Sequence, residues 1–457
     1  MSNSKDGEDF GPKGGDTRLD FYQGLFFEPS VLRIALMRMR PRWAGPWPRM
    51  AGRFRWKRIL ETPQEVVSRA DWVSLKPRVA GICGSDTAVF FGKSSAYLAP
   101  LASFPAVFGH EVVAQVTESR PGLPRGTRVV VDPTLGCSAR GAKVWCPACV
   151  AGNPHFCRQR QDLERGPGML LGYHARWPGG FSTAMWAPVA QTWVVPDAMT
   201  DARAVLTEPL ATVLSGLEQV EERPLGTVLV IGAGTIGLLT AFACRHLWDP
   251  EELHVVTRYP HQAAWAKRLG ADLVSLDKGF ALRSREILGL PSYRGKFGAP
   301  TYYPGGYDVV IDAVGTAASV RQALAQTKPG GQLLQLGGAG AMRNDLTPLW
   351  ARGIRWIGAY GYRSRAGIST FPKALSLLES TDLPIEDLVT HQYPLPQYAA
   401  ALRVLTDRKV PAIKVVLTQS SAGHGDFGKS PVVTIPSRRG VQAMSMGPKI
   451  SGESRGE

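Results

Sequence analysis

A glycine-rich turn between a predicted strand and a predicted helix constrains the fold of this chain more than any other feature. Across this turn the sequence is Val-Leu-Val-Ile-Gly-Ala-Gly-Thr-Ile-Gly-Leu-Leu-Thr. Gly232 permits the tight turn, Gly234 lets a pyrophosphate approach the backbone, and Gly237 lets the helix pack on the strand. Backbone amides at the helix start, at Thr235 and Ile236, would bind phosphate oxygens. The turn therefore predicts a dinucleotide-binding domain.

Further strands follow this turn and are separated by stretches with helical patterns. Segments 253–256, 307–315 and 331–337 are short and rich in Val or Leu, and the last two end in glycine. Strands that alternate with helices indicate a doubly wound parallel sheet.

The end of the second strand of this domain bears on the choice of cofactor. A dinucleotide fold that prefers NAD usually places an acid there for the ribose hydroxyl, but this chain has Thr257 followed by Arg258. A cation at this position would suit a 2′-phosphate, so we expect NADP to be preferred over NAD. The alternative is that Arg258 is solvated and that the preference is weak or absent.

A cysteine on a glycine-flanked turn follows an alternating strand at 72–79. The turn is Gly-Ile-Cys-Gly-Ser-Asp and contains Cys83, and a later Gly-His-Glu sequence contains His110 and Glu111. A thiolate, an imidazole and a carboxylate suit zinc, and three protein ligands with an open position are typical of catalytic zinc. Taken singly, Cys83 or His110 is more simply explained as a core side chain. The two motifs together favour zinc.

Three further polar residues would surround this metal. Ser85 would place a hydroxyl beside the open position, and Asp86 could hold the second nitrogen of the histidine. Glu208 begins a predicted helix that has Pro209 in its first turn. It is either a carboxylate stabilised by the helix dipole or a further carboxylate near the metal, and the sequence spacing leaves both open.

Four more cysteines lie close together in an irregular segment, 132–157, which we call the cysteine lobe. They are Cys137, Cys146, Cys149 and Cys157, with the spacing Cys-x8-Cys-x2-Cys-x7-Cys. Four thiolates in so short a span can bind a tetrahedral zinc and hold together a loop that has no core of its own. We therefore expect a structural zinc, with reduced thiols in a cytosol rather than a disulfide framework.

The chain is strongly basic. Its 457 residues carry a formal net charge of +15, and segment 31–58 has nine Lys or Arg, no acid and interleaved aromatic residues. Such a run could contact nucleic acid or a membrane surface. However, the alternation of basic and aromatic residues at 53–57 favours edge strands of the fold. We expect a small-molecule substrate as the main partner, with nucleic acid or membrane contact as the less favoured alternative.

Both ends of the chain and one internal segment are predicted to be irregular. Segments 1–25 and 418–457 are rich in small and polar residues and are predicted to be disordered tails. Segment 289–306 is rich in Gly, Pro and Tyr and is predicted to be an insertion loop. The N-terminus lacks the apolar core of a signal peptide, and segment 228–244 is too short and glycine-rich to cross a membrane. We expect a cytoplasmic protein.

In their order along the chain, these motifs make the sequence similar to the zinc-dependent medium-chain alcohol dehydrogenase family. The similarity runs from about residue 56 to 417, and it is closest to the polyol (sorbitol) and threonine dehydrogenase branch. The resemblance implies a mixed α/β fold. A β-rich, GroES-like catalytic domain would span 26–207, a doubly wound Rossmann domain 208–351, and a return to the catalytic domain 352–417. It also implies a homodimer or homotetramer.

The resemblance implies roles for the candidate site residues. Ser85 matches the hydroxyl that relays the alcohol proton, and Asp86 matches the partner of the zinc-binding histidine. The residues that match the catalytic zinc ligands and a nearby glutamate are Cys83, His110, Glu111 and Glu208.

The chain departs from the family pattern in two places. In the family, the usual spacing of the four lobe cysteines would put the first of them where this chain has Lys143. Cys137 would therefore have to supply that ligand through a longer loop. The histidine that often continues the proton relay is absent, since Thr87 and Ala88 follow the aspartate. The relay would then run through the cofactor ribose, through water, or not at all.

The expected activity is reversible hydride transfer between an alcohol or polyol and NAD(P), with zinc as a Lewis acid. Two zinc ions per chain are expected. One alternative is a non-catalytic ligand- or nucleic-acid-binding protein on the same fold, which the basic segment 31–58 motivates. The other is a zinc-free quinone or enone reductase, against which the complete set of Cys83, His110 and Glu111 argues. The sequence does not indicate which alcohol is the substrate.

Overall fold

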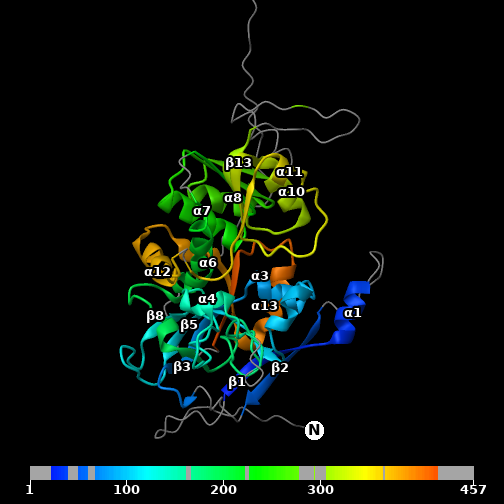
Figure 1. Cartoon of the computed structure of the whole chain (residues 1–457). Helices are drawn as coiled ribbons and strands as arrows, with labels where there is room; N and C mark the ends of the chain where they lie inside the picture. Colours follow the sequence, from blue (N-terminus) through cyan, green and yellow to red (C-terminus); the bar gives the residue numbers. More distant parts are fainter. Residues whose placement is uncertain are drawn as a thin grey trace, which may run out of the picture.

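Two lobes make up the described part of the chain (Figure 1). The computed structural model describes residues 22–39, 50–59, 67–160, 166–221, 226–276, 293, 305–363 and 366–419. A β-rich lobe contains strands from both ends of this part of the chain, and the other lobe is built on one parallel sheet.

The β-rich lobe contains a three-stranded and a seven-stranded sheet. The small sheet has the antiparallel order β2-β1-β4, and the large one has the order β15-β16-β3-β5-β6-β8, with β7 paired to β3. Strand β3 follows the alternation predicted for 72–79, with most of its apolar side chains buried. The strands of this lobe are β1 (Tyr22–Pro29), β2 (Gly52–Ile59), β3 (Trp72–Gly81), β4 (Ala106–Val107), β5 (Glu111–Val116), β6 (Arg128–Val131), β7 (Met185–Pro188), β8 (Thr192–Val194), β15 (Val389–Pro394) and β16 (Lys414–Thr418).

The second lobe is a six-stranded parallel sheet in the order β11-β10-β9-β12-β13-β14. Its central strand β9 is apolar and almost wholly buried, as expected for a parallel strand covered on both faces. This arrangement confirms the predicted doubly wound sheet. The strands are β9 (Thr227–Ile231), β10 (Glu252–Thr257), β11 (Leu273–Leu276), β12 (Tyr307–Asp312), β13 (Thr327–Gln335) and β14 (Arg355–Gly358).

Helices α7, α8, α10 and α11 lie around the parallel sheet, and α6 lies between the two lobes (Figure 1). Helix α6, predicted from its Glu-Pro start, packs against α7 and α12 and also contacts β5 and β6 of the β-rich lobe. None of the described helices is long and apolar enough to cross a bilayer. The α-helices are α1 (Val31–Met39), α3 (Gly84–Phe90), α4 (Pro147–Val150), α5 (Asp201–Ala204), α6 (Thr207–Leu217), α7 (Thr235–Leu247), α8 (Pro260–Arg268), α10 (Ala317–Gln326), α11 (Thr347–Ala351), α12 (Phe371–Ser380) and α13 (Tyr398–Thr406).

The chain returns to the β-rich lobe later than the sequence predicts. The predicted boundary at residue 352 is too early, because β14 still pairs with β13 in the parallel sheet. Strand β16 completes the return by pairing antiparallel with β3, so that Val416 lies opposite Gly81. This pairing places the start of β16 beside the turn that contains Cys83.

The N-terminal predictions are partly wrong. The predicted tail at 1–25 extends too far, because β1 begins at Tyr22 and its apolar residues are buried between β2 and β4. Within segment 31–58, β2 is the expected edge strand, but α1 is a helix. Residues 1–21, 420–457 and all of 289–304 except Tyr293 lie outside the described residues.

A cluster of aromatic side chains fixes the helix that follows the Cys83 turn. Phe90, the last residue of α3, is fully buried and packs against Phe27, Phe54 and Phe108 at centroid distances of 4.8–5.0 Å. Phe108 lies two residues before His110. The same cluster therefore anchors both segments that carry the predicted metal ligands.

Candidate active site

The strand pairing of the β-rich lobe brings the three predicted zinc ligands together. Strands β3 and β5 are antiparallel, with Gly81 opposite Glu111. As a result, the ligand atoms of Cys83, His110 and Glu111 all lie within 4.8 Å of one another. A Cβ atom at Gly81 would lie 1.9 Å from Glu111 Oε2, so this position requires glycine. A thiol, an imidazole and a carboxylate at these distances form a donor set that fits zinc.

Asp86 orients the first two of these ligands. Its Oδ2 accepts a hydrogen bond from the Cys83 amide at 3.0 Å, which caps the start of α3. Its Oδ1 lies 3.3 Å from His110 Nδ1, and both side chains are buried. Because Nδ1 faces the carboxylate, Nε2 is the nitrogen left for a metal. The structure thus places the Asp86 carboxylate next to His110.

A buried lysine accompanies Glu111. Lys414 Nζ, at the start of β16, lies 2.5 Å from Glu111 Oε2, and its side chain is only 3% exposed. Burial alone would lower the pKa of Lys414, but the neighbouring carboxylate outweighs burial and raises it, so the amine stays charged. The sequence prediction missed this residue. A lone lysine in the otherwise apolar closing strand was the available signal.

Glu208 lies beside these ligands but outside their close group. It is buried in the first turn of α6, and Tyr362 Oη donates a hydrogen bond to its Oε1 at 2.5 Å. Burial raises the pKa of Glu208 to about 7, with the charge of Glu111 adding to the effect and His110 opposing it. No sequence signal pointed to Tyr362, which comes from the segment after β14.

Ser85 lies at the open side of the site. It is exposed at the start of α3, whereas Asp86 next to it is fully buried. Tyr173, a buried residue from the irregular segment before β7, has its Oη 3.0 Å from Ser85 Oγ and 2.9 Å from Asp86 Oδ1. Burial raises the pKa of Tyr173 well above 10, so the phenol keeps its proton. The sequence prediction missed this residue as well.

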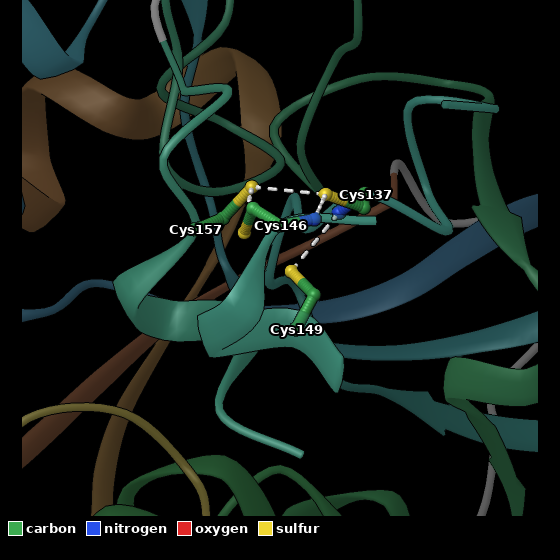
Figure 2. A group of neighbouring side chains, drawn as sticks. All are labelled: Cys137, Cys146, Cys149 and Cys157. Carbon is green, nitrogen blue, oxygen red and sulfur yellow. Dashed lines mark hydrogen bonds between the residues drawn. The ribbon is translucent and has the colours of Figure 1, made fainter. Parts of the chain in front are cut away.

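The four lobe cysteines are gathered in one buried group (Figure 2). Their sulfur atoms all lie within 4.8 Å of one another, with 3.6 Å between the sulfurs of Cys137 and Cys157. Backbone amides donate to the sulfurs, for example from Cys146 to the Cys137 sulfur at 3.3 Å. Burial alone would raise the pKa of Cys146, but amide donors such as that of Arg158 lower it to about 6. The longer loop therefore does bring Cys137 in, while Lys143 is exposed.

The cysteine lobe, 132–157, packs against the segment that follows β14. The ring of His155, 7% exposed, lies against Gly361, where a Cβ would come within 2.5 Å of the ring. Burial lowers the pKa of His155 to about 4, helped by the charges of Arg363 and Arg160. Arg363 also forms an ion pair with the buried Asp132 at 3.0 Å. The lobe and the segment that carries Tyr362 are thus in direct contact.

The glycine-rich turn has the geometry that the sequence predicts. Gly232 has a φ of +95°, and a Cβ at Gly237 would lie 1.8 Å from the Gly232 carbonyl oxygen. Gly234 caps α7 and faces open space. The backbone amides at the helix start are therefore accessible to a phosphate. Thr235 Oγ1 donates to the carbonyl of Ile413 at 3.0 Å, which ties the helix start to the segment before β16.

Thr257 and Arg258, the two residues predicted to set the cofactor preference, have different environments at the end of β10. Thr257 is buried, and its hydroxyl donates to Gln262 Oε1 at 2.7 Å. Arg258 is exposed at the carboxyl end of the strand. Of the two, Arg258 is therefore the side chain that could reach a bound ligand.

Two family models match the chain. Residues 69–197 match the alcohol dehydrogenase GroES-like domain, and residues 235–380 match the zinc-binding dehydrogenase family, which together cover more than half of the chain. The chain belongs to the zinc-dependent medium-chain alcohol dehydrogenase family. It is an NAD(P)-dependent alcohol oxidoreductase with a GroES-like domain and a Rossmann domain, which confirms the predicted family and fold class.

Relatives of this family match most of the chain. The starvation-sensing protein RspB of Escherichia coli (strain K12) is 28% identical over 369 residues, 80% of this chain and 95% of that protein. A sorbitol dehydrogenase of Arabidopsis thaliana is 28% identical over 331 residues, 71% of this chain and 82% of that protein. The crystal structure of RspB from E. coli CFT073, complexed with NADH, matches with a TM-score of 0.64 and 22% identity. That match covers 87% of this chain and 99% of the other, and it shows the fold.

Proposed function

We propose that this protein is a zinc-dependent alcohol dehydrogenase that interconverts an alcohol or polyol and the matching carbonyl compound, with NADP as the preferred cofactor. The convergence of Cys83, His110 and Glu111 beside the exposed hydroxyl of Ser85 carries this proposal. The names of its relatives, a sorbitol dehydrogenase among them, support a polyol as the substrate class.

The three ligand residues would hold zinc through the Cys83 thiolate, one nitrogen of His110 and the Glu111 carboxylate. When bound, the ion would supply Lewis-acid polarisation of the substrate oxygen. The Asp86 carboxylate lies beside His110, and the charged Lys414 offsets part of the negative charge of the ligand set. Glu208 is a further carboxylate next to this set.

Ser85 is the hydroxyl placed to handle the substrate proton. In oxidation the alcohol loses a hydride from carbon to the nicotinamide and a proton from oxygen, so that alcohol and NADP⁺ give the carbonyl compound, NADPH and a proton. Ser85 Oγ would accept a hydrogen bond from the substrate hydroxyl, and the proton would leave to solvent at the exposed side of the site. In reduction a proton would enter by the same route. Thr87 cannot continue the relay, because its hydroxyl is bonded to the Gly84 carbonyl at 2.8 Å.

The four lobe cysteines would hold a second, structural zinc. All four sulfurs are buried and converge on one point, which leaves no open position for a substrate. The lobe would then have no direct part in the chemistry. Its contact with the segment that carries Tyr362 supports a role in shaping the site.

A cofactor comparison tests the proposed preference. The kcat/KM for NADP should exceed that for NAD, and Arg258→Ala should lower the NADP value at least about tenfold, because a charge-assisted contact to the phosphate is lost. The NAD value should barely change. Arg321→Ala, which removes an exposed arginine of α10, is the matched control. A wild-type protein that turns over faster with NAD at equal concentration would refute the preference.

Metal analysis tests the zinc assignment. Protein purified without added metal should contain two zinc ions per chain, and removal of the metal with a chelator should stop turnover of a panel of alcohols and polyols. Zinc added back should restore it. Full turnover by protein that contains no zinc would refute a metal-dependent reaction.

A further inference from the structure

A buried tyrosine contacts the candidate proton-relay serine from a distant part of the chain. Tyr173 lies 88 residues after Ser85, and its Oη is 3.0 Å from Ser85 Oγ. The same Oη is 2.9 Å from Asp86 Oδ1, which in turn lies 3.3 Å from His110 Nδ1. The residues that follow Asp86 in α3 offer no free hydroxyl, since that of Thr87 is bonded within the helix.

The tyrosine has one proton for two neighbours, so only one of the two contacts can use it. Asp86 is fully buried, and a buried carboxylate oxygen that lacks a donor is costly. If the tyrosine donated to Ser85 instead, its oxygen would face Asp86 Oδ1 at 2.9 Å with no hydrogen between them. Tyr173 therefore donates to Asp86.

This direction decides the direction of the second hydrogen bond. Because the Tyr173 hydroxyl donates its one hydrogen bond to Asp86, its oxygen can only accept a hydrogen bond from Ser85. The serine hydroxyl hydrogen then points inward to the tyrosine. The lone pairs of Ser85 Oγ remain for the open side of the site, where a substrate hydroxyl would donate a hydrogen bond.

We propose that Tyr173 is a positioning residue that fixes Ser85 as a hydrogen-bond acceptor toward the alcohol. This inference rests on the proposed function. Its chemistry is a hydrogen-bond direction only: no proton has to leave the tyrosine, and no bond of the protein is made or broken. The chain of donors runs from substrate hydroxyl to Ser85, from Ser85 to Tyr173, and from Tyr173 to Asp86.

The surroundings of Tyr173 hold it in this orientation. Its ring packs on Phe108 at a centroid distance of 4.8 Å and on His110 at 5.7 Å, and the side chain is 6% exposed. Its backbone amide donates to the Leu170 carbonyl at 3.0 Å. The preceding Gly172 has a φ of +86°, which a residue with a side chain rarely adopts. The hydroxyl is thus presented on a rigid segment.

A double-mutant cycle on the zinc-loaded enzyme tests the proposal. Ser85→Ala should lower kcat for alcohol oxidation about a hundredfold, because the substrate hydroxyl loses its positioned hydrogen-bond acceptor. Tyr173→Phe should lower kcat about tenfold with little change in KM, because one orienting hydrogen bond is lost. The double variant should be no slower than Ser85→Ala, since the tyrosine would act only through the serine.

A matched control separates orientation from general damage. Tyr307→Phe removes the hydroxyl of another fully buried tyrosine, which contacts His254 in the parallel sheet, and it should leave kcat unchanged. A crystal structure of metal-free Tyr173→Phe gives a readout independent of activity. Ser85 should occupy more than one rotamer there, whereas the wild-type serine should point at the tyrosine.

Two outcomes would overturn the inference while leaving the proposed function intact: wild-type kcat in Tyr173→Phe, or losses that multiply in the double variant. Failure of the proposed function looks different. In that case wild type and Tyr307→Phe would both lack turnover of alcohols, and an unchanged Ser85 rotamer in the Tyr173→Phe crystal would still count against the inference.

Discussion

The two candidate metal-ligand groups of this chain are assembled in different ways. The lobe group comes from one segment, 137–157, and its sulfurs accept hydrogen bonds mainly from nearby backbone amides. The active-site group comes from the ends of β3 and β5. Asp86 of the same turn lies against this group. The side chains that surround it from other parts of the chain are Tyr173, Glu208 and Lys414.

This difference distinguishes the proposed structural site from the proposed reactive one. A group of four buried sulfurs on one loop closes on itself and leaves no position for a substrate. The active-site group is buried on the side of Asp86 and Glu111 but partly exposed at Cys83 and Ser85. The exposed side gives a substrate access, and the buried side fixes the orientation and charge of the ligands.

The largest expected effect separates the two groups directly. Cys83→Ala should lower turnover at least about a thousandfold, because the metal that would polarise the substrate is lost. Zinc, measured by elemental analysis, should fall from two ions per chain to one, while cofactor binding by the Rossmann domain persists. Cys244→Ala, which changes a buried free thiol of α7, should retain both ions. Unchanged turnover in Cys83→Ala would remove the distinction between the groups.

A variant of the cysteine lobe should lose the other zinc ion and stability. Cys137→Ala should lose the lobe zinc and lower the free energy of unfolding by several kcal/mol, because metal binding there is coupled to folding. The folded fraction should keep its active-site zinc. Lys143→Ala, at the position where the family usually has the first cysteine, should keep both ions. If Lys143→Ala lost zinc and Cys137→Ala did not, the fourth lobe ligand would be wrongly assigned.

A third variant measures the cost of the buried charges at the active site. Lys414→Met leaves Glu111 buried without its partner and should lower the free energy of unfolding by about 3 kcal/mol in urea denaturation of the metal-free protein. Lys373→Met removes the more exposed partner of Glu218 and should cost less than about 1 kcal/mol. Equal effects of the two variants would show that Lys414 carries no special electrostatic role.

The smallest effect concerns the dependence of stability on pH at the lobe. The folded-state pKa of His155 is about 4, below its ordinary 6.5, so below pH 6.5 the unfolded chain binds a proton that the folded chain does not. Protonation of the unfolded chain should therefore lower the free energy of unfolding as the pH falls from 6.5 to 4, by about 3 kcal/mol.

A variant isolates this titration from the protonation of the lobe thiols. His155→Gln retains all four cysteines, so thiol protonation acts on both proteins, and the difference in unfolding free energy between them reports the histidine. In urea denaturation, the free energy of unfolding of wild type should fall relative to that of His155→Gln as the pH is lowered from 6.5 to 4. A difference that does not change with pH would show that the folded protein accepts the proton on His155 freely.

Most of the secondary structure could be predicted from local patterns. The alternation in β3, the apolar run of β9 and the Glu-Pro start of α6 depend on residues close in sequence, so their elements form where expected. The prediction failed for segment 31–39, which forms a helix, and for β14, which extends the parallel sheet beyond residue 352. A short strand is defined by its partner, and the partner is not visible in its own sequence.

The sequence by itself determined the chemistry this protein can perform. The Cys83 turn, the Gly-His-Glu motif, the four lobe cysteines and the glycine-rich turn specify ligand types and backbone shapes, which are local properties. Only the tertiary structure decided which side chains surround the metal ligands. Tyr173, Tyr362 and Lys414 reach the site because strand pairing and chain return bring remote segments together. Contacts between residues far apart in the chain leave no local sequence pattern, so they are seen only in the three-dimensional structure.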